Sequence, residues 1–415
     1  MQLRPYQETA FSQVMHKLQT FGVCYLAGEV RTGKTLVALH AAWHHCGHTG
    51  KVLFVTKKLA MSGIRSDIDQ SGLDLNIVLL NYEQLHKVNF RVDFIIYDEA
   101  HCLGMFPKPA KKTAIARQKF AGITSLFLSG TPSPESYSQL YHQFYVTGKG
   151  PWKFYNTFYK WARDYVLVKV LHIGSGRTIN DYSCAKPVVV QEFERFKVSM
   201  TQEQAGFNGR IIEHIHAIEM PVELQDLIKQ LRKTRIYKPL GLIADTGARL
   251  MSMIHQLCSG TVINNEGEHI QLVDHKIKFI KSVFKGKRIA VFYCFVSEGD
   301  MLRKNFKCTS DPIEFAKSKD LVFVSQVVSG REGINLSIAD DLIFFNIPYS
   351  ATSYFQAKAR SQSIDGGDKN VHWLFSVAGI EEKIYSIILN KKSSYTLNHF
   401  KKDYEIRQSA RKVGA

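Results

Sequence analysis

The segment 28–35, which reads GEVRTGKT, constrains the fold of this chain more than any other feature of its sequence. The segment follows an apolar run typical of a buried strand, residues 22–27, and precedes a stretch long enough for a helix. It therefore matches the GxxxxGK[ST] pattern in the strand–loop–helix context that this pattern requires. We predict an α/β lobe built around a phosphate-binding loop.

Each motif position has a chemical role in such a loop. Gly28 and Gly33 let backbone N–H groups point at phosphate oxygens, and the helix that follows adds its positive end. Lys34 reaches the β- and γ-phosphates, and Thr35 ligates Mg²⁺. The sequence thus predicts binding of ATP with Mg²⁺ as cofactor.

A second motif, YDEAH at 97–101, ends the apolar run 94–97. Uncompensated charge at the end of a buried strand is costly, so a positive partner is expected. If this strand lies beside the phosphate loop, Asp98 can hold Mg²⁺ through its water shell and Glu99 can orient and activate the attacking water. A solvated acidic turn is the alternative, and the phosphate loop makes the catalytic interpretation the favoured one.

A third motif, LSGTP at 128–132, again stands at a strand end. Alone it is a common turn sequence. Because LSGTP follows the other two motifs in order along the chain, it becomes informative. We predict that Ser129 and Thr131 link His101 to the neighbouring strand and sense the state of the nucleotide.

Strand-like apolar runs separated by helix-length stretches occur at both ends of the chain, at 22–27, 52–55, 77–80, 94–97, 125–128, 288–295, 321–325, 342–346 and 371–375. This alternation is typical of parallel sheets covered on both faces. The middle differs, because it is rich in aromatic residues and then carries two amphipathic stretches, 222–233 and 246–258. We predict an ATP-binding lobe over 1–150, a mainly helical connector or insertion over 151–270, and a second lobe over 271–415.

The charge balance favours a polyanionic partner. Lys and Arg number 54 against 37 Asp and Glu, a formal net charge of +17. Nucleic acid is the first candidate and an anionic membrane the second, while a basic surface kept for solubility is the plain alternative. We expect no membrane association and no targeting segment, because no apolar run is long enough to span a bilayer.

Cysteine and histidine usage adds little chemistry. The seven cysteines are scattered without a CxxC pair, which favours reduced thiols and a soluble protein of the cytoplasm or nucleus. The cluster HHCGH at 44–48 has no second ligand group at suitable spacing, so we do not expect a metal site there.

The ordered motifs LRPYQ, GEVRTGKT, NYEQL, YDEAH, LSGTP, GREGINL and QAKAR resemble those of superfamily 2 helicases, here with a DEAH box. In detail, VSGREGINL, then FFNIPYSATSYFQAKAR, then GIEEKI at 379–384 resemble the Swi/Snf-type DNA translocases. The resemblance covers nearly the whole chain. It implies two RecA-like lobes in a compact, monomeric motor of the viral or bacterial kind.

The resemblance also implies roles for individual residues. Gln7 of LRPYQ would recognise adenine through its amide. Gln356 and Arg360 would face the γ-phosphate when the lobes close, with Arg360 as an arginine finger. Gly333 and Asn335 would approach the nucleotide or couple it to the nucleic acid.

One position departs from the family pattern. Related motors carry two arginines three residues apart in the segment that matches QAKARSQS, whereas Arg360 is followed at that spacing by Ser363. Arg331 could supply the missing charge, or it could face solvent or DNA.

The resemblance to translocases favours duplex DNA over RNA as the track. Phosphate contacts suffice for movement that ignores sequence, and the candidates in the first lobe are Lys57, Lys58, Asn81 and Tyr82. Apolar alternation around a Gly-Ser-Gly turn in 165–183 predicts a hairpin, either a wedge at forks or an ordinary surface feature.

Three functions fit these features. The first is a DNA-dependent ATPase and helicase that remodels forks or branched DNA in replication, recombination or repair. The second is a motor that remodels protein–DNA complexes or serves a defence or restriction assembly. The third is an ATP-gated clamp with little turnover. The sequence leaves protein partners open.

Overall fold

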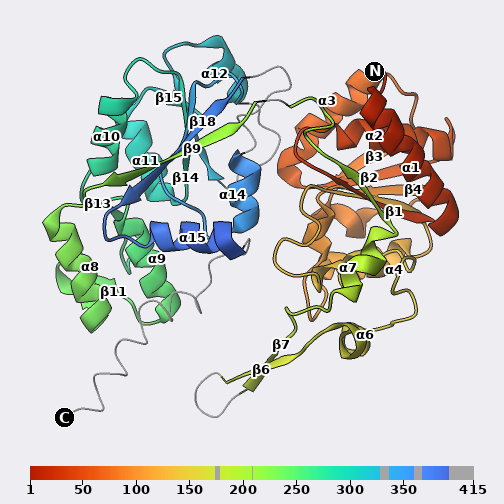
Figure 1. Cartoon of the computed structure of the whole chain (residues 1–415), viewed down its shortest axis with the longest axis horizontal. Coiled ribbons are helices and arrows are strands. Elements are labelled where there is room, and N and C mark those ends of the chain that lie inside the picture. The colour runs from red at the N-terminus through yellow and green to blue at the C-terminus, as the bar shows by residue number, and fades with distance from the viewer. Residues whose placement is uncertain (173–177, 208, 328–335, 359–366, 392–415) are drawn as a thin grey trace. The chain divides into compact units, whose positions relative to one another are not determined.

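The computed structural model describes residues 1–415 except 173–177, 208, 328–335, 359–366 and 392–415. The chain forms two units, Met1–Gly206 and Phe207–Ala415. Each unit is built on a parallel sheet of six strands with helices on both faces (Figure 1). The predicted α/β class with two parallel-sheet lobes is therefore confirmed.

The predicted division into three parts needs correction. Residues 151–270 are divided between the two units, because a strand from this segment joins each sheet. β8 (Lys197–Met200) pairs with β1 (Val23–Gly28) in unit 1, and β9 (Ile211–Ile218) pairs with β18 (Lys369–Ser376) in unit 2. The predicted helical stretches are present, as α8 (Val222–Thr234) and α9 (Gly247–Leu257).

The sheet of unit 1 has the order β3-β2-β4-β5-β1-β8. Its other strands are β2 (Val52–Thr56), β3 (Ile77–Asn81), β4 (Phe94–Tyr97) and β5 (Thr124–Ser129). Its helices are α1 (Pro5–Phe21), α2 (Lys34–Cys46), α3 (Met61–Ser71), α4 (Lys111–Phe120), α5 (Gln139–Tyr145), α6 (Phe158–Tyr165) and α7 (Val188–Glu194), with short 3₁₀ helices η1 (Lys58–Ala60), η2 (Tyr82–Lys87) and η3 (Ala100–Leu103).

Two cores cover the faces of this sheet. Because side chains alternate along a strand, Leu26 of β1 packs with α1 and α2, whereas Tyr25 packs with aromatic side chains of α5 on the other face. Both faces of the central strands are therefore buried, which explains their uninterrupted apolar sequences.

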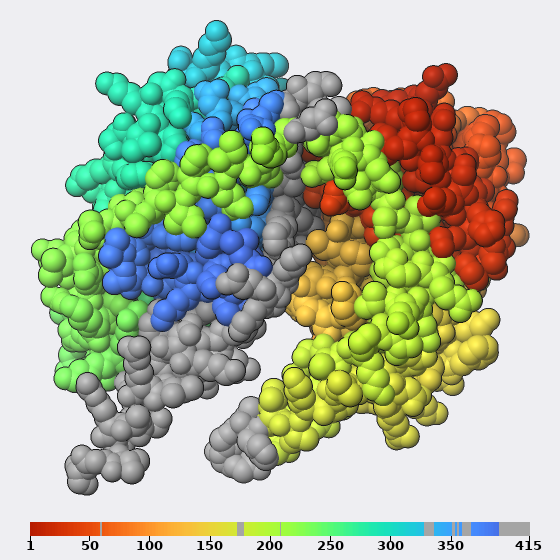
Figure 2. Space-filling model, in the orientation of Figure 1, coloured from red at the N-terminus to blue at the C-terminus, as the bar shows by residue number. Residues whose placement is uncertain are grey.

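The predicted hairpin is confirmed as β6 (Lys169–His172) and β7 (Thr178–Asp181), which pair antiparallel with Lys169 opposite Asp181. The segment that carries it, yellow in the figures, extends from the body of unit 1 (Figures 1 and 2). Val170 and Ile179 are 57% and 48% exposed, so the ribbon presents apolar side chains to solvent.

The sheet of unit 2 has the order β15-β16-β14-β17-β18-β9. The strands not yet given are β14 (Ile289–Tyr293), β15 (Cys308–Thr309), β16 (Val322–Gln326) and β17 (Asp341–Phe344), and two small ribbons are β10 (Ile236–Tyr237) with β11 (Leu242–Ile243) and β12 (Thr261–Ile263) with β13 (His269–Gln271). The remaining helices are α10 (His275–Val283), α11 (Val296–Asn305), α12 (Pro312–Lys317), α14 (Ala351–Lys358), α15 (Glu381–Lys391) and η4 (Lys238–Leu240).

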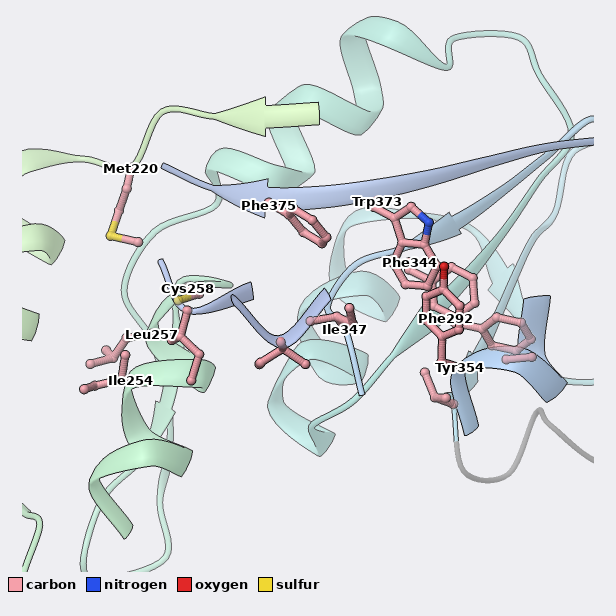
Figure 3. Packing of buried hydrophobic residues seen from close by; sticks show 14 of the residues in the cluster. Met220, Ile254, Leu257, Cys258, Phe292, Phe344, Ile347, Tyr354, Trp373 and Phe375 are labelled. Carbon is pink, nitrogen blue, oxygen red and sulfur yellow. The ribbon is translucent and has the colours of Figure 1, made fainter. Parts of the chain in front are cut away.

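Stacked aromatic rings join α14 to this sheet (Figure 3). The ring of Trp373 stacks on Phe344 at 3.9 Å and on Tyr354 of α14 at 4.8 Å between centroids. Tyr354 Oη and Trp373 Nε1 both donate to Glu213 Oε2 of β9, at 2.6 and 2.8 Å. The helix that opens the QAKAR motif is thus fixed to strands from distant parts of the sequence. Across the described parts of both units, no helix combines the length and the apolar character that a membrane span needs.

Candidate nucleotide site

The sequence motifs of unit 1 converge because parallel strands end at the same edge of a sheet. Tyr25, Phe127 and Tyr97 lie level on β1, β5 and β4. The phosphate loop after β1 and the YDEAH segment after β4 therefore share one edge. We expected these two strands to be neighbours, but β5 lies between them. This order inserts Ser129, at the end of β5, between the phosphate loop and the acidic pair.

The phosphate loop leads directly into α2. Gly33 has φ +78° and caps the helix without a side-chain hydrogen bond, so the first N–H groups of α2 are available for an anion. Lys34 Nζ donates to the carbonyl oxygens of Gly28 and Glu29 at 2.7 and 2.9 Å. The ammonium group therefore lies over the loop in which phosphates would bind.

Side chains from outside the loop hold its backbone. Tyr6 Oη and Gln7 Nε2 donate to the carbonyl oxygen of Thr32 at 3.0 and 3.3 Å, and Gln202 Nε2 donates to that of Val30 at 3.1 Å. The Oε1 atom of Gln7 accepts from Arg4 N at 2.9 Å. The buried Gln7 thus contacts the phosphate loop, and recognition of adenine by this residue stays a prediction.

Asp98 is a buried carboxylate with one hydroxyl partner. Thr56 Oγ1 donates to Asp98 Oδ2 at 2.7 Å. Burial, followed by the charge of Glu99, raises the pKa of Asp98 to about 6. A nearby cation would favour its ionised form, so the environment fits a metal-holding carboxylate.

Glu99 has the opposite electrostatic environment. Its own burial raises its pKa, but the hydrogen bond and charge of His101, together with Lys34 and Lys57, lower the pKa more, and the net shift is downward. His101 Nδ1 lies 3.1 Å from Glu99 Oε2. Glu99 is therefore held ionised, as a group that accepts a proton from water must be.

The predicted link between His101 and the third motif is present in the structure. His101 Nδ1 lies 3.1 Å from Ser129 Oγ, which also accepts from Thr131 N at 3.1 Å. Thr131 Oγ1 is buried and has no hydrogen-bond partner within the described parts of the chain. These contacts join the ends of β4 and β5 beside the acidic pair.

Mg²⁺ fits this donor set. Asp98 would hold the ion through its water shell and Thr35 would supply a hydroxyl, and Mg²⁺ in nucleotide sites takes its other ligands from phosphates and water. Within the residues that the structure describes, no group of three or more His, Cys, Asp or Glu is arranged to hold a metal ion. The nucleotide's phosphates would therefore have to complete the coordination.

Two predicted DNA contacts need correction. Tyr82 is only 1% exposed, and its Oη donates to the carbonyl oxygen of Asp98 at 2.6 Å. Asn81 is also buried, and its Oδ1 accepts from Glu83 N and Gln84 N at the start of η2. Tyr82 therefore supports the acidic strand end from inside, whereas Asn81 caps η2, and neither buried side chain is an exposed contact for DNA.

The two predicted lysines differ in position. Lys57 is partly buried and contributes to the field at Glu99, whereas Lys58 is exposed at the start of η1. Of the second-lobe residues, Gly333, Asn335, Arg331, Arg360 and Ser363 lie outside the described residues. Gln356 lies in α14, but its side chain is not among the parts of the chain that the structure describes.

Solved structures with a similar fold include the SWI2/SNF2 ATPase core of Sulfolobus solfataricus. Its complex with dsDNA is 18% identical over 94% of this chain and 91% of that chain, with a TM-score of 0.43. A second structure, of the SWI2/SNF2 ATPase core domain from the same organism, is 16% identical over 95% of this chain and 89% of that chain, with a TM-score of 0.42. The chain resembles Swi/Snf-type ATPase cores.

A third similar structure is the ATP-dependent Type ISP restriction-modification enzyme LlaBIII bound to DNA. It is 13% identical with a TM-score of 0.49, over 91% of this chain and 28% of that chain. No family model matches the chain, and no curated protein matches it either. At these values the likenesses concern the fold and name neither an activity nor a partner for this chain.

Proposed function

We propose that the chain is an ATP-driven motor that moves on duplex DNA as a monomer and remodels forks or branched DNA in replication, recombination or repair. The observation that supports it most is the meeting of a phosphate loop with two carboxylates, the buried Asp98 and the partly buried Glu99, whose pKa values shift in opposite directions. Titratable groups whose environments shift their pKa values in opposite directions at one site are typical of catalytic sites.

The residues divide the work of hydrolysis. Lys34 and the N-terminus of α2 would bind the phosphates, and Asp98 with Thr35 would hold Mg²⁺, which would supply positive charge to stabilise the phosphates. Glu99, kept ionised by His101, orients the attacking water and accepts its proton. We retain adenine binding for Gln7, phosphate contacts for Gln356 and Arg360, and nucleotide coupling for Gly333 and Asn335, as the motif resemblance implies.

DNA is proposed as the track because of charge and motif type. A net charge of +17 suits a polyphosphate partner, and movement along DNA needs phosphate contacts without base readout. Lys58 is exposed at the carboxyl end of β2, on the same edge as the nucleotide site. We propose Lys57 and Lys58 as phosphate contacts of unit 1.

The β6–β7 hairpin suits a wedge at a junction. Ser136 Oγ donates to the carbonyl oxygen of Ser183, and Ser138 Oγ donates to that of Tyr182, both at 2.6 Å. These serines follow Ser129 and Thr131 on the same loop, so the base of the hairpin is anchored to the segment that leaves the nucleotide site. Exposed Val170 and Ile179 offer apolar contacts of the kind that separate stacked bases.

The first test measures ATP hydrolysis by the full chain with duplex DNA, with single-stranded RNA and without nucleic acid. Duplex DNA should stimulate hydrolysis far more than RNA, and Lys34→Ala should abolish it. Equal stimulation by RNA would contradict the proposed track, and hydrolysis without any response to nucleic acid would contradict the motor.

The second test measures strand displacement on forked DNA. Replacing 170–177 with a tight turn, or combining Val170→Ser with Ile179→Ser, should reduce fork processing and spare duplex-stimulated hydrolysis. Ile313→Ser, at a side chain 65% exposed on α12 of unit 2, is the matched control for loss of an exposed apolar group. Unchanged fork processing by the hairpin variants would identify an ordinary surface hairpin.

A further inference from the structure

Arg31 lies inside the phosphate loop and has two features that oppose folding. Its φ is +67°, in the left-handed region where residues other than glycine are strained. Its Nη1 atom is buried and has no hydrogen-bond partner among the residues that the structure describes. Neither feature is explained by the roles of Lys34, Asp98 and Glu99.

The electrostatic cost at Arg31 agrees with this geometry. Burial lowers the pKa of Arg31, although a guanidinium stays protonated under ordinary conditions. A buried N–H group without an acceptor has lost its hydration and gained nothing in return. When strain and an unsatisfied donor coincide at one residue of a binding loop, a functional reason is a better explanation than packing.

The residues on both sides of Arg31, Val30 and Thr32, are held from outside the loop through their carbonyl oxygens. The carbonyl oxygen of Val30 accepts from Gln202, and that of Thr32 accepts from Tyr6 and Gln7. These contacts come from α1 and from the segment that follows β8. They fix the strained conformation before any ligand binds, so the position of Arg31 is preorganised.

We propose that Arg31 binds the terminal phosphate of ATP from within the phosphate loop, as a second cation beside Lys34. The inference rests on the proposed ATP-binding function. An anionic phosphate oxygen would satisfy the buried Nη1 atom with a charge-assisted hydrogen bond.

The test compares a triphosphate with a diphosphate. The dissociation constants of a slowly hydrolysed ATP analogue and of ADP are measured with Mg²⁺ for the native full chain, Arg31→Met and Arg31→Gly. Both variants should bind the ATP analogue about tenfold or more weakly, as expected for loss of a charged hydrogen bond, with a much smaller change for ADP. Arg91→Met, at a side chain 90% exposed, removes the same charge outside the site and should change neither constant.

Thermal unfolding without nucleotide adds a readout that is independent of binding. Arg31→Gly should melt no lower than the native chain, because glycine adopts φ +67° freely and removes the unsatisfied donor. A clearly lower melting temperature would show that Arg31 is needed for folding and would overturn the proposal.

The binding data separate this proposal from the proposed function. Native affinity for the ATP analogue in both Arg31 variants, or an equal loss for ADP and the analogue, would overturn the role of Arg31 while leaving ATP binding intact. If the native chain binds neither nucleotide, the proposed function fails together with it. Lys34→Ala should lose binding of both nucleotides. This variant shows whether the binding measured for the native chain occurs at the phosphate loop.

Discussion

Asp98→Asn should make the protein more stable and inactive. Burial and the charge of Glu99 raise the pKa of Asp98 from the usual 3.8 to about 6. The native state therefore binds this proton more tightly than the unfolded state does. Asparagine keeps the size of the side chain and an oxygen that can accept from Thr56 Oγ1, but it removes the charge.

The size of the effect follows from the pKa shift. Well below the unfolded pKa of 3.8 the carboxyl is protonated in both states and imposes no cost, whereas well above the native pKa of about 6 it is ionised in both and the native state bears the full cost. A shift of roughly two pKa units corresponds to about 3 kcal/mol. We expect Asp98→Asn to raise the free energy of unfolding by up to about 3 kcal/mol at neutral pH and by almost nothing near about pH 3.

Urea unfolding in metal-free buffer across this pH range measures the difference. Tryptophan fluorescence reports mainly on unit 1, which holds Trp43, Trp152 and Trp161 of the four tryptophans. Asp93→Asn, at the residue just before the same strand, is the matched control, and it should change the free energy of unfolding at neutral pH in the opposite direction. Its carboxylate accepts from Lys51 N at 2.9 Å and pairs with Arg91, and both contacts lower its pKa, so loss of the negative charge should destabilise the fold at neutral pH.

A difference between native and Asp98→Asn protein that does not change with pH would refute the reasoning, as would a less stable variant at neutral pH. The functional half of the prediction is separate. Mg²⁺ with ATP should stabilise the native chain against urea, and this stabilisation and ATP hydrolysis should both be lost in the variant.

Three shorter predictions concern the same unit. Glu99→Gln should still bind ATP but release almost no phosphate, and near-normal turnover would exclude Glu99 as the water-orienting group. Tyr82→Phe should lose about 1 kcal/mol of stability with its hydrogen bond to the Asp98 carbonyl and keep native DNA affinity; a selective loss of DNA affinity would restore Tyr82 as a contact. Duplex binding should weaken steeply between about 50 and 200 mM salt and show no sequence preference, and a flat salt response in a filter or fluorescence titration would argue against phosphate contacts.

The sequence predicted those parts of the fold that depend on local pattern. Buried parallel strands such as β2 and β4 are uninterrupted apolar runs, and the amphipathic periods of α8 and α9 are regular. The strand order was not predictable in this way. Periodicity does not say which strands are neighbours, and so the position of β5 between β1 and β4 became known only from the structure.

Edge strands explain the error in the domain boundaries. β9 reads IIEHIHAI and is partly exposed at the end of its sheet, so it mixes apolar and polar residues and lacks the signature of a buried strand. β8 is short and also lies at an edge. Both were therefore missed in the segment 151–270, although together they give each unit its sixth strand.

The site was predictable where a motif itself carries chemistry. Lys34, Asp98 and Glu99 are recognisable because few other arrangements suit phosphate and metal. Asn81 and Tyr82 were misassigned, since a residue directly after a strand can point either to solvent or inward. The residue type of Tyr82 indicates its position. Tyr82 comes directly after a strand of the sheet that also carries Asp98, and a large aromatic side chain at such a position is expected in the core of the unit.

Unit 2 carries a buried ion pair that motif reading did not reveal. Lys276 of α10 and Glu381 of α15 are fully buried, and Lys276 Nζ donates to Glu381 Oε1 at 2.8 Å. Lys276 Nζ also donates to the carbonyl oxygen of Phe345 at 2.8 Å, just after β17. Glu381 belongs to the GIEEKI segment, so at least one acidic residue of that motif has a structural partner.

Removing one partner of this pair should cost much more than removing both. Lys276→Met or Glu381→Leu alone leaves an uncompensated buried charge, which typically costs about 3–5 kcal/mol. The double variant removes both charges and should recover much of this loss, although the carbonyl of Phe345 would then lack its donor, a deficit of about 1–3 kcal/mol. Urea unfolding of the four proteins of the cycle measures the coupling. If the two single losses simply add in the double variant, the pair does not interact as described, and the link from α10 to α15 must be held by the apolar contacts around it.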